Sequence, residues 1–209
     1  MSAPLSPLVH LIDDDEAVRS SLALLISTVG LRVQGWADPQ QFLREFPRQD
    51  IGAIVLDVRM PGISGLAVLQ TLVAQGVDQP VIMLTGHGTV DMCRRAFKAG
   101  AAEFLEKPAD DEALLEALQN AVRQHVKSRE RVAADRVARE RYAQLSERER
   151  EVVGLIVEGL TNKEIGRALV LSPRTVETHR ANLFAKLQAE SLAQLIRRYA
   201  AVIEEAAGG

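Results

Sequence analysis

The sequence is poor in cysteine and in long apolar runs, and both absences restrict the class of protein. Its 209 residues include one cysteine, Cys93, so no disulfide can form within the chain. This count excludes a disulfide-stabilised scaffold and fits a reducing compartment. No apolar run approaches the roughly 20 residues of a membrane helix, and the N-terminus lacks the basic and apolar segments of a signal peptide. We therefore expect a cytoplasmic protein without a membrane partner.

The chain also lacks a strong net charge, but its charges are unevenly distributed. The formal net charge is −3. Residues 1–121 carry 16 acidic and 9 basic side chains, residues 122–144 carry 3 acidic and 7 basic ones, and residues 145–209 carry 9 of each. An acidic, a basic and a neutral segment in this order indicate two domains with different functions, joined by a basic linker.

The first 121 residues alternate between short apolar runs and amphipathic segments. Apolar runs rich in branched residues predict strands, and apolar residues three or four positions apart predict helices. The predicted strands cover residues 8–12, 31–35, 53–57, 81–85 and 102–105, and a helix is expected after each. Five strands that alternate with five helices favour an α/β fold with a doubly wound five-stranded parallel sheet.

Polar side chains follow four of these predicted strands, at the point where each strand ends. They are Asp13, Asp14, Asp57, Thr85 and Lys107. The carboxyl ends of parallel strands meet at one edge of a sheet, so we expect these side chains to converge. Three carboxylates that converge without a cation would repel one another, and oxygen ligands suit Mg²⁺. This set predicts phosphoryl transfer, with Asp57 as the nucleophile.

Each of these residues also has an ordinary structural explanation. Carboxylates such as Asp13 and Asp14 favour helix N-termini, where they act as caps. Thr85 can be a plain strand residue, and Lys107 can be a solvated charge. A lone aspartate at a strand end, such as Asp57, is most often a turn cap. The occurrence of all five in order at successive strand ends makes a shared site the better interpretation.

A known family has this arrangement of residues. Residues 7–121 resemble a response-regulator receiver domain, whose fold is flavodoxin-like. The resemblance implies that Asp57 accepts a phosphoryl group from a partner sensor histidine kinase. The residues that carry the resemblance are Asp13-Asp14, Asp57, Thr85 and Lys107-Pro108.

The resemblance also implies roles for the surrounding residues. The backbone carbonyl of Arg59 is expected to hold Mg²⁺ together with the three aspartates. Lys107 is expected to contact the phosphate, and its peptide bond to Pro108 is expected to be cis. Thr85 is expected to move toward the phosphoryl oxygens, and Phe104 is expected to change rotamer with it.

The basic segment 122–144 is predicted to be a helical linker. Its residues 123–141 contain no glycine or proline and are rich in alanine, arginine and glutamate, which favours a continued helix. Its valines form only a broken apolar stripe, which is too weak to indicate a coiled coil. A solvated spacer and a helix that forms dimers or touches phosphates are both compatible with this pattern.

Residues 145–209 are predicted to form a small all-α domain of four helices. Helix starts are expected at Ser146, Thr161, Ser172 and Ser191, two of them in capping boxes and one followed by proline. The short second helix and the turn after it indicate a helix-turn-helix, a motif that binds double-stranded DNA through its second helix.

One side of the third predicted helix in this domain is suited to a DNA groove. Its apolar residues fall on one side at 3.6 residues per turn, and small and polar residues fall on the other. Glu177 is expected to accept a hydrogen bond from a cytosine amino group. The predicted groove-facing residues are Glu177, Thr178, Ala181 and Asn182, and the predicted phosphate contacts are Asn162, Lys163, Arg174, Thr175 and Lys186.

This domain resembles the LuxR-type DNA-binding domain over about residues 142–205. The motifs are LSEREREVV, GLTNKEIG and LSPRTVETHRANLFAKL. With the receiver, they identify the chain as resembling a two-component response regulator of the NarL/FixJ family, and TGHG with SPRTVETHRANL is most similar to the FixJ branch. The resemblance implies that phosphorylation promotes a homodimer, which binds promoter DNA and regulates transcription, with RNA polymerase as a further partner.

Two other functions are compatible with the residues. The first is a phosphatase with an aspartyl nucleophile, but such an enzyme normally has a second acid where Arg59 stands. We therefore expect no enzyme beyond self-phosphorylation from a phosphodonor and slow autodephosphorylation. The second is an adaptor whose helical domain binds protein, and an absence of DNA binding by residues 142–209 would favour it.

Overall fold

The computed structural model describes residues 7–86 and 88–207, so His87 of the TGHG motif lies outside the described residues. The chain divides into two compact units, the first ending at Arg129 and the second starting at Glu130. Within the described part of the chain, no helix is both long and apolar enough to cross a membrane.

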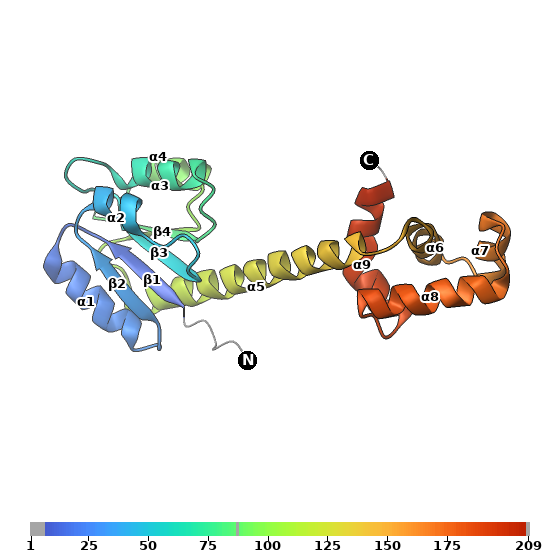
Figure 1. Ribbon diagram of the computed structural model, residues 1–209. Helices are drawn as coiled ribbons and strands as arrows, with labels where there is room; N and C mark the ends of the chain where they lie inside the picture. Colours follow the sequence, from blue (N-terminus) through green and yellow to red (C-terminus); the bar gives the residue numbers. More distant parts are fainter. Residues whose placement is uncertain (1–6, 87, 208–209) are drawn as a thin grey trace. The chain divides into compact units, whose positions relative to one another are not determined.

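Strands and helices alternate along the first unit (Figure 1). β2 lies one residue later than the pattern predicts, because Trp36 pairs with Ile12 in the sheet and its indole is buried. The elements are β1 (Leu8–Ile12), α1 (Glu16–Ser27), β2 (Arg32–Trp36), α2 (Pro39–Glu45), β3 (Gly52–Asp57), α3 (Gly65–Ala74), β4 (Val81–Thr85), α4 (Val90–Lys98), β5 (Glu103–Glu106) and α5 (Asp111–Ala143).

The five strands form one parallel sheet in the order β2-β1-β3-β4-β5. The chain runs from β1 outward to β2 and then returns to β3 on the other side of β1. The carboxyl ends of the strands form a crevice where the strand order reverses in this way. Asp57 ends β3 and Asp13 directly follows β1, so the topology brings the two residues together. The predicted α/β fold is confirmed.

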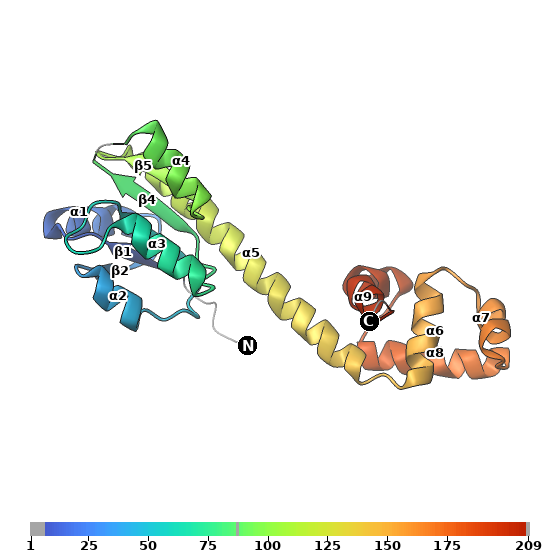
Figure 2. The ribbon, with the colours of Figure 1, turned by 90° about the horizontal axis from the view of Figure 1, so that it is seen from above.

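Side chains alternate between the two faces of the sheet, and each face has its own core. On one face, Ile12, Ile54 and Met83 belong to a buried cluster that includes residues of α2, α3 and α4. On the other face, Val55 and Leu84 belong to a cluster that includes residues of α1 and α5. Figure 2 views the first unit from the side of α2 and α3. The two cores hold the carboxyl ends of β1, β3 and β4 in fixed positions.

The second unit contains the last turns of α5 and four helices. The helices are α6 (Glu147–Val157), α7 (Asn162–Leu169), α8 (Pro173–Leu187) and α9 (Leu192–Ala207). Ser146 and Thr161 form the predicted capping boxes, and the Ser172 side chain accepts from the amide of Thr175. The amide of Gln194 donates to the Ser191 hydroxyl oxygen at the start of α9. These local hydrogen bonds could be predicted from the sequence because both partners lie within one helical turn.

The turn between α7 and α8 has a tight geometry. Val170 adopts a left-handed conformation (φ 55°, ψ 47°), which is uncommon for a β-branched residue. A Cβ on Gly166 would lie 2.8 Å from the carbonyl oxygen of Leu171. Only a residue without a side chain therefore allows α7 to approach this turn so closely, and the turn sets the start of α8.

Candidate functional site

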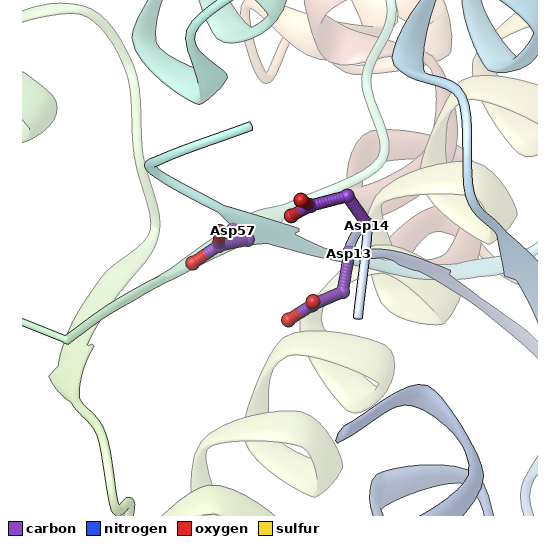
Figure 3. Close-up of side chains that lie close together, drawn as sticks. All are labelled: Asp13, Asp14 and Asp57. Atoms are coloured by element: carbon purple, nitrogen blue, oxygen red, sulfur yellow. The ribbon is translucent and has the colours of Figure 1, made fainter. Parts of the chain in front are cut away.

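Three aspartates gather at the crevice of the first unit (Figure 3). Asp13 and Asp14 follow β1, and Asp57 ends β3. One carboxylate oxygen of each lies within 4.8 Å of those of the other two. Asp13 is 2% exposed and Asp57 is 6% exposed, whereas Asp14 is exposed to solvent. The cluster therefore has a buried floor and one solvent-facing carboxylate.

A lysine that directly follows β5 completes this cluster. The Nζ atom of Lys107 lies 2.5 Å from Oδ2 of Asp13 and 2.9 Å from Oδ1 of Asp57. Its backbone amide donates to the carbonyl oxygen of Thr85 at 2.6 Å, and its peptide bond to Pro108 is cis, as the resemblance implied. The lysine thus joins the ends of β1 and β3.

The electrostatics of the cluster are not balanced by the lysine alone. Burial raises the pKa of the Asp57 carboxyl group above its ordinary value. Hydrogen bonds from Lys107 and the backbone amide of Arg59 counteract this rise, and the charge of Asp13 adds to it. Burial also disfavours the charge of Lys107, but its hydrogen bonds to both aspartates outweigh burial and raise its pKa.

The donor set fits a hard divalent cation. The group offers only carboxylate oxygens, and its excess negative charge is what such a cation neutralises. Of the three carboxylates, only that of Asp14 is exposed to solvent. The residues that could hold the cation are Asp13, Asp14 and Asp57.

Two further predicted receiver residues, Thr85 and Phe104, lie toward α4. Thr85 is fully buried, and its Oγ1 lies 3.9 Å from Sδ of Met92 on α4. Phe104 is half-buried and lines a surface hollow of about 470 Å³ with Gly88, Val90 and other residues of α4 and β5. The structure thus places Lys107 on the aspartates, and it places Thr85 and Phe104 toward α4.

Two residues near this site were missed by the sequence reasoning. A Cβ on Gly65 would lie 2.1 Å from the backbone oxygen of Asp57, so the start of α3 needs glycine there. The backbone amide of Gly88 donates to Oε1 of Glu106 at 3.1 Å, which ties the β4–α4 loop to β5. A glycine directly after the cap Ser64 was the only sequence signal for the first contact.

The second unit presents the predicted DNA-facing side of α8 to solvent. Val176, Leu183 and Leu187 are fully buried on the opposite side of the helix. Asn162 and Thr175 are half-buried, and the Thr175 hydroxyl lies 2.7 Å from that of Ser172. The exposed predicted residues are Lys163, Arg174, Glu177, Thr178, Ala181, Asn182 and Lys186.

Lys186 differs from the other predicted phosphate contacts because it has a buried partner. Its Nζ lies 2.6 Å from Oε2 of Glu149, a residue of α6 that is 3% exposed. The same Glu149 oxygen accepts from the amide of Ser146 at 2.7 Å. Burial opposes the charge of Glu149, but the bonds to Lys186 and Ser146 hold its pKa below the ordinary value. Glu149 therefore connects the start of α6 to the end of α8.

An acidic cluster with a lysine at the crevice of a doubly wound sheet, followed by a helix-turn-helix, defines a class of protein: a phosphorylation-controlled DNA-binding regulator. Comparisons with known families agree. "Response regulator receiver domain" matches residues 9–119, and "Bacterial regulatory proteins, luxR family" matches residues 143–199. The chain belongs to the two-component response regulators with a receiver domain and a LuxR-type DNA-binding domain.

Individual relatives place the chain near FixJ. It is 48% identical to the transcriptional regulatory protein FixJ of Azorhizobium caulinodans over 190 residues, 90% of each chain. It is 43% identical to FixJ of Bradyrhizobium diazoefficiens over 191 residues, 90% of this chain and 92% of the relative. Among solved structures, the response regulator StyR matches 92% of this chain and 97% of its own with a TM-score of 0.81 and 35% identity. Full-length FixJ from B. japonicum matches 92% and 95% with a TM-score of 0.59 and 40% identity.

Proposed function

We propose that Asp57 accepts a phosphoryl group from a sensor histidine kinase, and that the phosphorylated chain forms a homodimer on promoter DNA. The observation that carries this proposal is the buried Asp57 carboxylate, which lies 2.9 Å from the Lys107 ammonium and beside two further carboxylates. A buried aspartate next to a lysine ammonium is suited to transient phosphorylation, because the ammonium offsets the charge of the incoming phosphoryl group.

In the proposed reaction, a carboxylate oxygen of Asp57 attacks the phosphorus of a phosphohistidine on the kinase. The P–N bond breaks as the new P–O bond forms, and the imidazole nitrogen retains the electron pair and takes up a proton. Lys107, already at the Asp57 oxygen, neutralises charge on the transferred group. Slow attack by water on the acyl phosphate releases inorganic phosphate and restores the Asp57 carboxylate. We propose no enzymatic activity beyond this self-phosphorylation and slow autodephosphorylation.

Mg²⁺ is the proposed cofactor. Asp13, Asp14, Asp57 and the backbone carbonyl of Arg59 would hold it. When bound, it would supply positive charge to the oxygens of the transferred phosphoryl group.

The proposed response to phosphorylation passes through Thr85 and Phe104. Movement of the Thr85 hydroxyl toward the phosphoryl oxygens would break its 3.9 Å contact with Met92 and leave space for Phe104 to rotate inward. Both changes alter the surface of α4 and β5, which supports receiver dimerisation through that surface. Because packed side chains such as Phe104 have two discrete arrangements, a small shift of Thr85 can produce a larger change on the surface of α4 and β5.

For the output, we propose a receiver at residues 1–121, a helical linker at 122–144 and a DNA-binding domain at 145–209. The proposed readers of the major groove are the exposed residues Glu177, Thr178, Ala181 and Asn182. Asn162, Lys163, Arg174, Thr175 and Lys186 are the proposed phosphate contacts. RNA polymerase is a proposed partner of the DNA-bound dimer, and the cytoplasm is the proposed location.

Replacement of Asp57 by asparagine tests the switch. The side-chain amide of Asp57→Asn cannot form an acyl phosphate, so a small phosphodonor such as acetyl phosphate with Mg²⁺ should no longer add about 80 Da to the chain. Dimerisation in sedimentation experiments and gel-shift binding should both lose their dependence on the donor. Glu45→Gln, which alters an exposed residue at the end of α2, is the matched control and should respond like the unmodified sequence. Donor-dependent dimerisation and DNA binding by the Asp57→Asn chain would refute the assignment.

A further inference from the structure

The first turns of the basic linker are bound to the receiver by three polar side chains. We call this cluster the α5 clamp: His125 and Arg129 of α5, and Asp78 of the loop between α3 and β4. His125 contacts Gly52, the first residue of β3, whereas Asp57 is the last residue of the same strand. The clamp therefore lies at the amino-terminal ends of the strands, whereas the phosphoacceptor site lies at their carboxyl ends.

His125 is the buried part of the clamp, with a side chain that is 1% exposed. Its Nδ1 atom lies 3.0 Å from the carbonyl oxygen of Gly52 and 3.2 Å from the amide nitrogen of the same residue. Nε–H of Arg129 donates to its Nε2 atom at 3.3 Å. The Nε2 atom also lies 3.4 Å from Oδ1 of Asp78. Both ring nitrogens thus have partners on the receiver or on α5 itself.

Arg129 forms the outer part of the clamp. Its Nε atom lies 2.8 Å from one carboxylate oxygen of Asp78, and a terminal nitrogen lies 2.8 Å from the other oxygen. The same terminal nitrogen donates to the carbonyl oxygen of Arg48 at 3.0 Å. A bidentate arginine–carboxylate ion pair fixes the relative orientation of its two groups in addition to attracting them. Arg129 therefore fixes α5 against the loops that precede β3 and β4.

Apolar contacts continue along the same side of α5. Ala121 is 7% exposed and Val122 is 6% exposed, and both belong to the core on that face of the sheet. Val126 is partly buried against this core. The burial ends abruptly after the clamp: residues 130–137 are all exposed, and Val132 is 63% exposed. The next buried residue, Ala138, belongs to the core of the second unit.

We propose that the α5 clamp makes residues 122–129 a rigid part of the receiver, so that the conformational freedom of the linker begins at Glu130. Two ion pairs of the exposed segment 130–137 lie within the helix, Arg131–Asp135 at 3.9 Å and Arg136–Glu140 at 3.7 Å. Ala133, Ala134 and Val137 line a surface hollow together with residues of α9. Every residue of this segment is exposed, so fewer buried contacts oppose its local opening than oppose that of residues 121–126.

The chain contains natural protease sites on both sides of the proposed boundary. Trypsin cleaves after lysine and arginine, and cleavage of a helix requires local unfolding. Arg123 and Lys127 lie within the clamped segment, whereas Arg131 and Arg136 lie in the exposed one. In brief digestion of the full chain without phosphodonor or DNA, we expect the earliest linker cuts after Arg131 and Arg136. Equally early cuts after Arg123 or Lys127 would overturn the proposal.

Asp78→Ala tests whether the clamp itself causes this protection. Removal of the carboxylate leaves Arg129 without its two-pronged partner, and the cleavage rate after Arg123 and Lys127 should rise about tenfold, which corresponds to about 1.4 kcal/mol of lost protection. The matched control is Asp91→Ala, which removes an exposed carboxylate from a 2.8 Å ion pair with Arg94 on α4. It should leave the cutting pattern unchanged.

A second variant gives an independent measurement. Arg129→Gln removes the arginine side of the clamp, and hydrogen exchange of the amides of residues 122–129 should quicken about tenfold while those of 130–137 remain as they are. Unchanged exchange in Arg129→Gln or unchanged cleavage in Asp78→Ala would show that packing alone holds this segment. Neither measurement uses phosphorylation or DNA, so its outcome is separate from that of the Asp57 switch.

Discussion

At the scale of residues, the phosphoacceptor site has three carboxylates and one ammonium within a few ångströms. Lys107 binds the two buried carboxylates, Asp13 and Asp57, so the exposed Asp14 adds negative charge that the lysine does not neutralise. Burial is the main cause of the raised pKa of Asp57, and the charge of Asp13 adds to it. The site is therefore arranged for a cation that the protein itself does not supply.

This arrangement predicts that Mg²⁺ stabilises the receiver. At about ten times its dissociation constant, a ligand of the folded state adds about 1.4 kcal/mol to the free energy of unfolding. Asp14→Asn removes a proposed, solvent-facing ligand without disturbing the core, and the variant should lose at least about half of this increase. Trp36 is the only tryptophan and is buried in the receiver, so its fluorescence during urea unfolding measures the effect in this unit.

The control for this measurement is Asp91→Asn, which should retain the full stabilisation by Mg²⁺. An equal response to Mg²⁺ in Asp14→Asn and in the unmodified chain would mean that Asp14 is not a ligand. No response in the unmodified chain would remove the metal site from the proposal.

At the scale of elements, Glu149 connects two helices of the DNA-binding unit. It accepts from the Ser146 amide at the start of α6 and from Lys186 near the end of α8. The capping part of this role was predicted from the spacing of Ser146 and Glu149. The link to Lys186 was not, because the two residues are 37 positions apart and only the packing of α6 on α8 brings them together.

Glu149→Gln should lower the free energy of unfolding of this unit by about 1 kcal/mol at pH 7, since it weakens the bonds that the buried side chain accepts from Ser146 and from the solvent-exposed Lys186. The pKa of Glu149 in the folded chain lies below its ordinary value of 4.5. Its contribution is therefore present above pH 4.5 and is lost as the pH falls through the lower folded value. Hydrogen exchange of the α8 amides at pH 7 and at successively lower pH values measures the difference between the two sequences.

Glu147→Gln is the matched control on the same helix turn. Glu147 is exposed, so its replacement should change the free energy of unfolding by no more than about 0.5 kcal/mol. A pH-independent difference between Glu149→Gln and the unmodified chain would show that the ion pair is not the cause.

At the scale of the whole molecule, the charge distribution bears on how DNA binding is controlled. Residues 145–209 have as many acidic as basic side chains, so long-range attraction to DNA is weak for a single domain. Two DNA-binding domains joined by dimerised receivers would act on two half-sites with a raised effective concentration. Dimerisation would then be the step that controls occupancy of the DNA.

We therefore predict a strong dependence on the number of half-sites. On a DNA fragment selected by the phosphorylated chain, affinity for two half-sites should exceed affinity for one by about 10² or more, and only when the phosphodonor is present. Gel-shift titrations at one fixed salt concentration measure this ratio, with the Asp57→Asn chain as the control. A ratio near one with the donor present would exclude control by dimerisation.

The receiver site was predictable from the sequence because its residues follow strand ends. Asp13, Asp57 and Lys107 are far apart in the chain, but a parallel sheet brings all strand ends to one edge. The hydrogen-bonded helix starts at Ser146 and Thr161 were predictable because their partners lie within one turn. In each case a short sequence pattern and a general rule of folding were sufficient.

The sequence by itself therefore determined the fold class, the strand-end cluster with Asp57 and the four-helix output domain. Only the tertiary structure decided which side chains across the chain became partners: Lys186 with Glu149, and His125 with Gly52. A charged or polar residue at a helix position that is predicted to be exposed looks the same in the sequence whether its side chain is solvated or bound to a residue of another element. The distinction depends on which surfaces meet when the core packs, and this is a property of the folded chain as a whole.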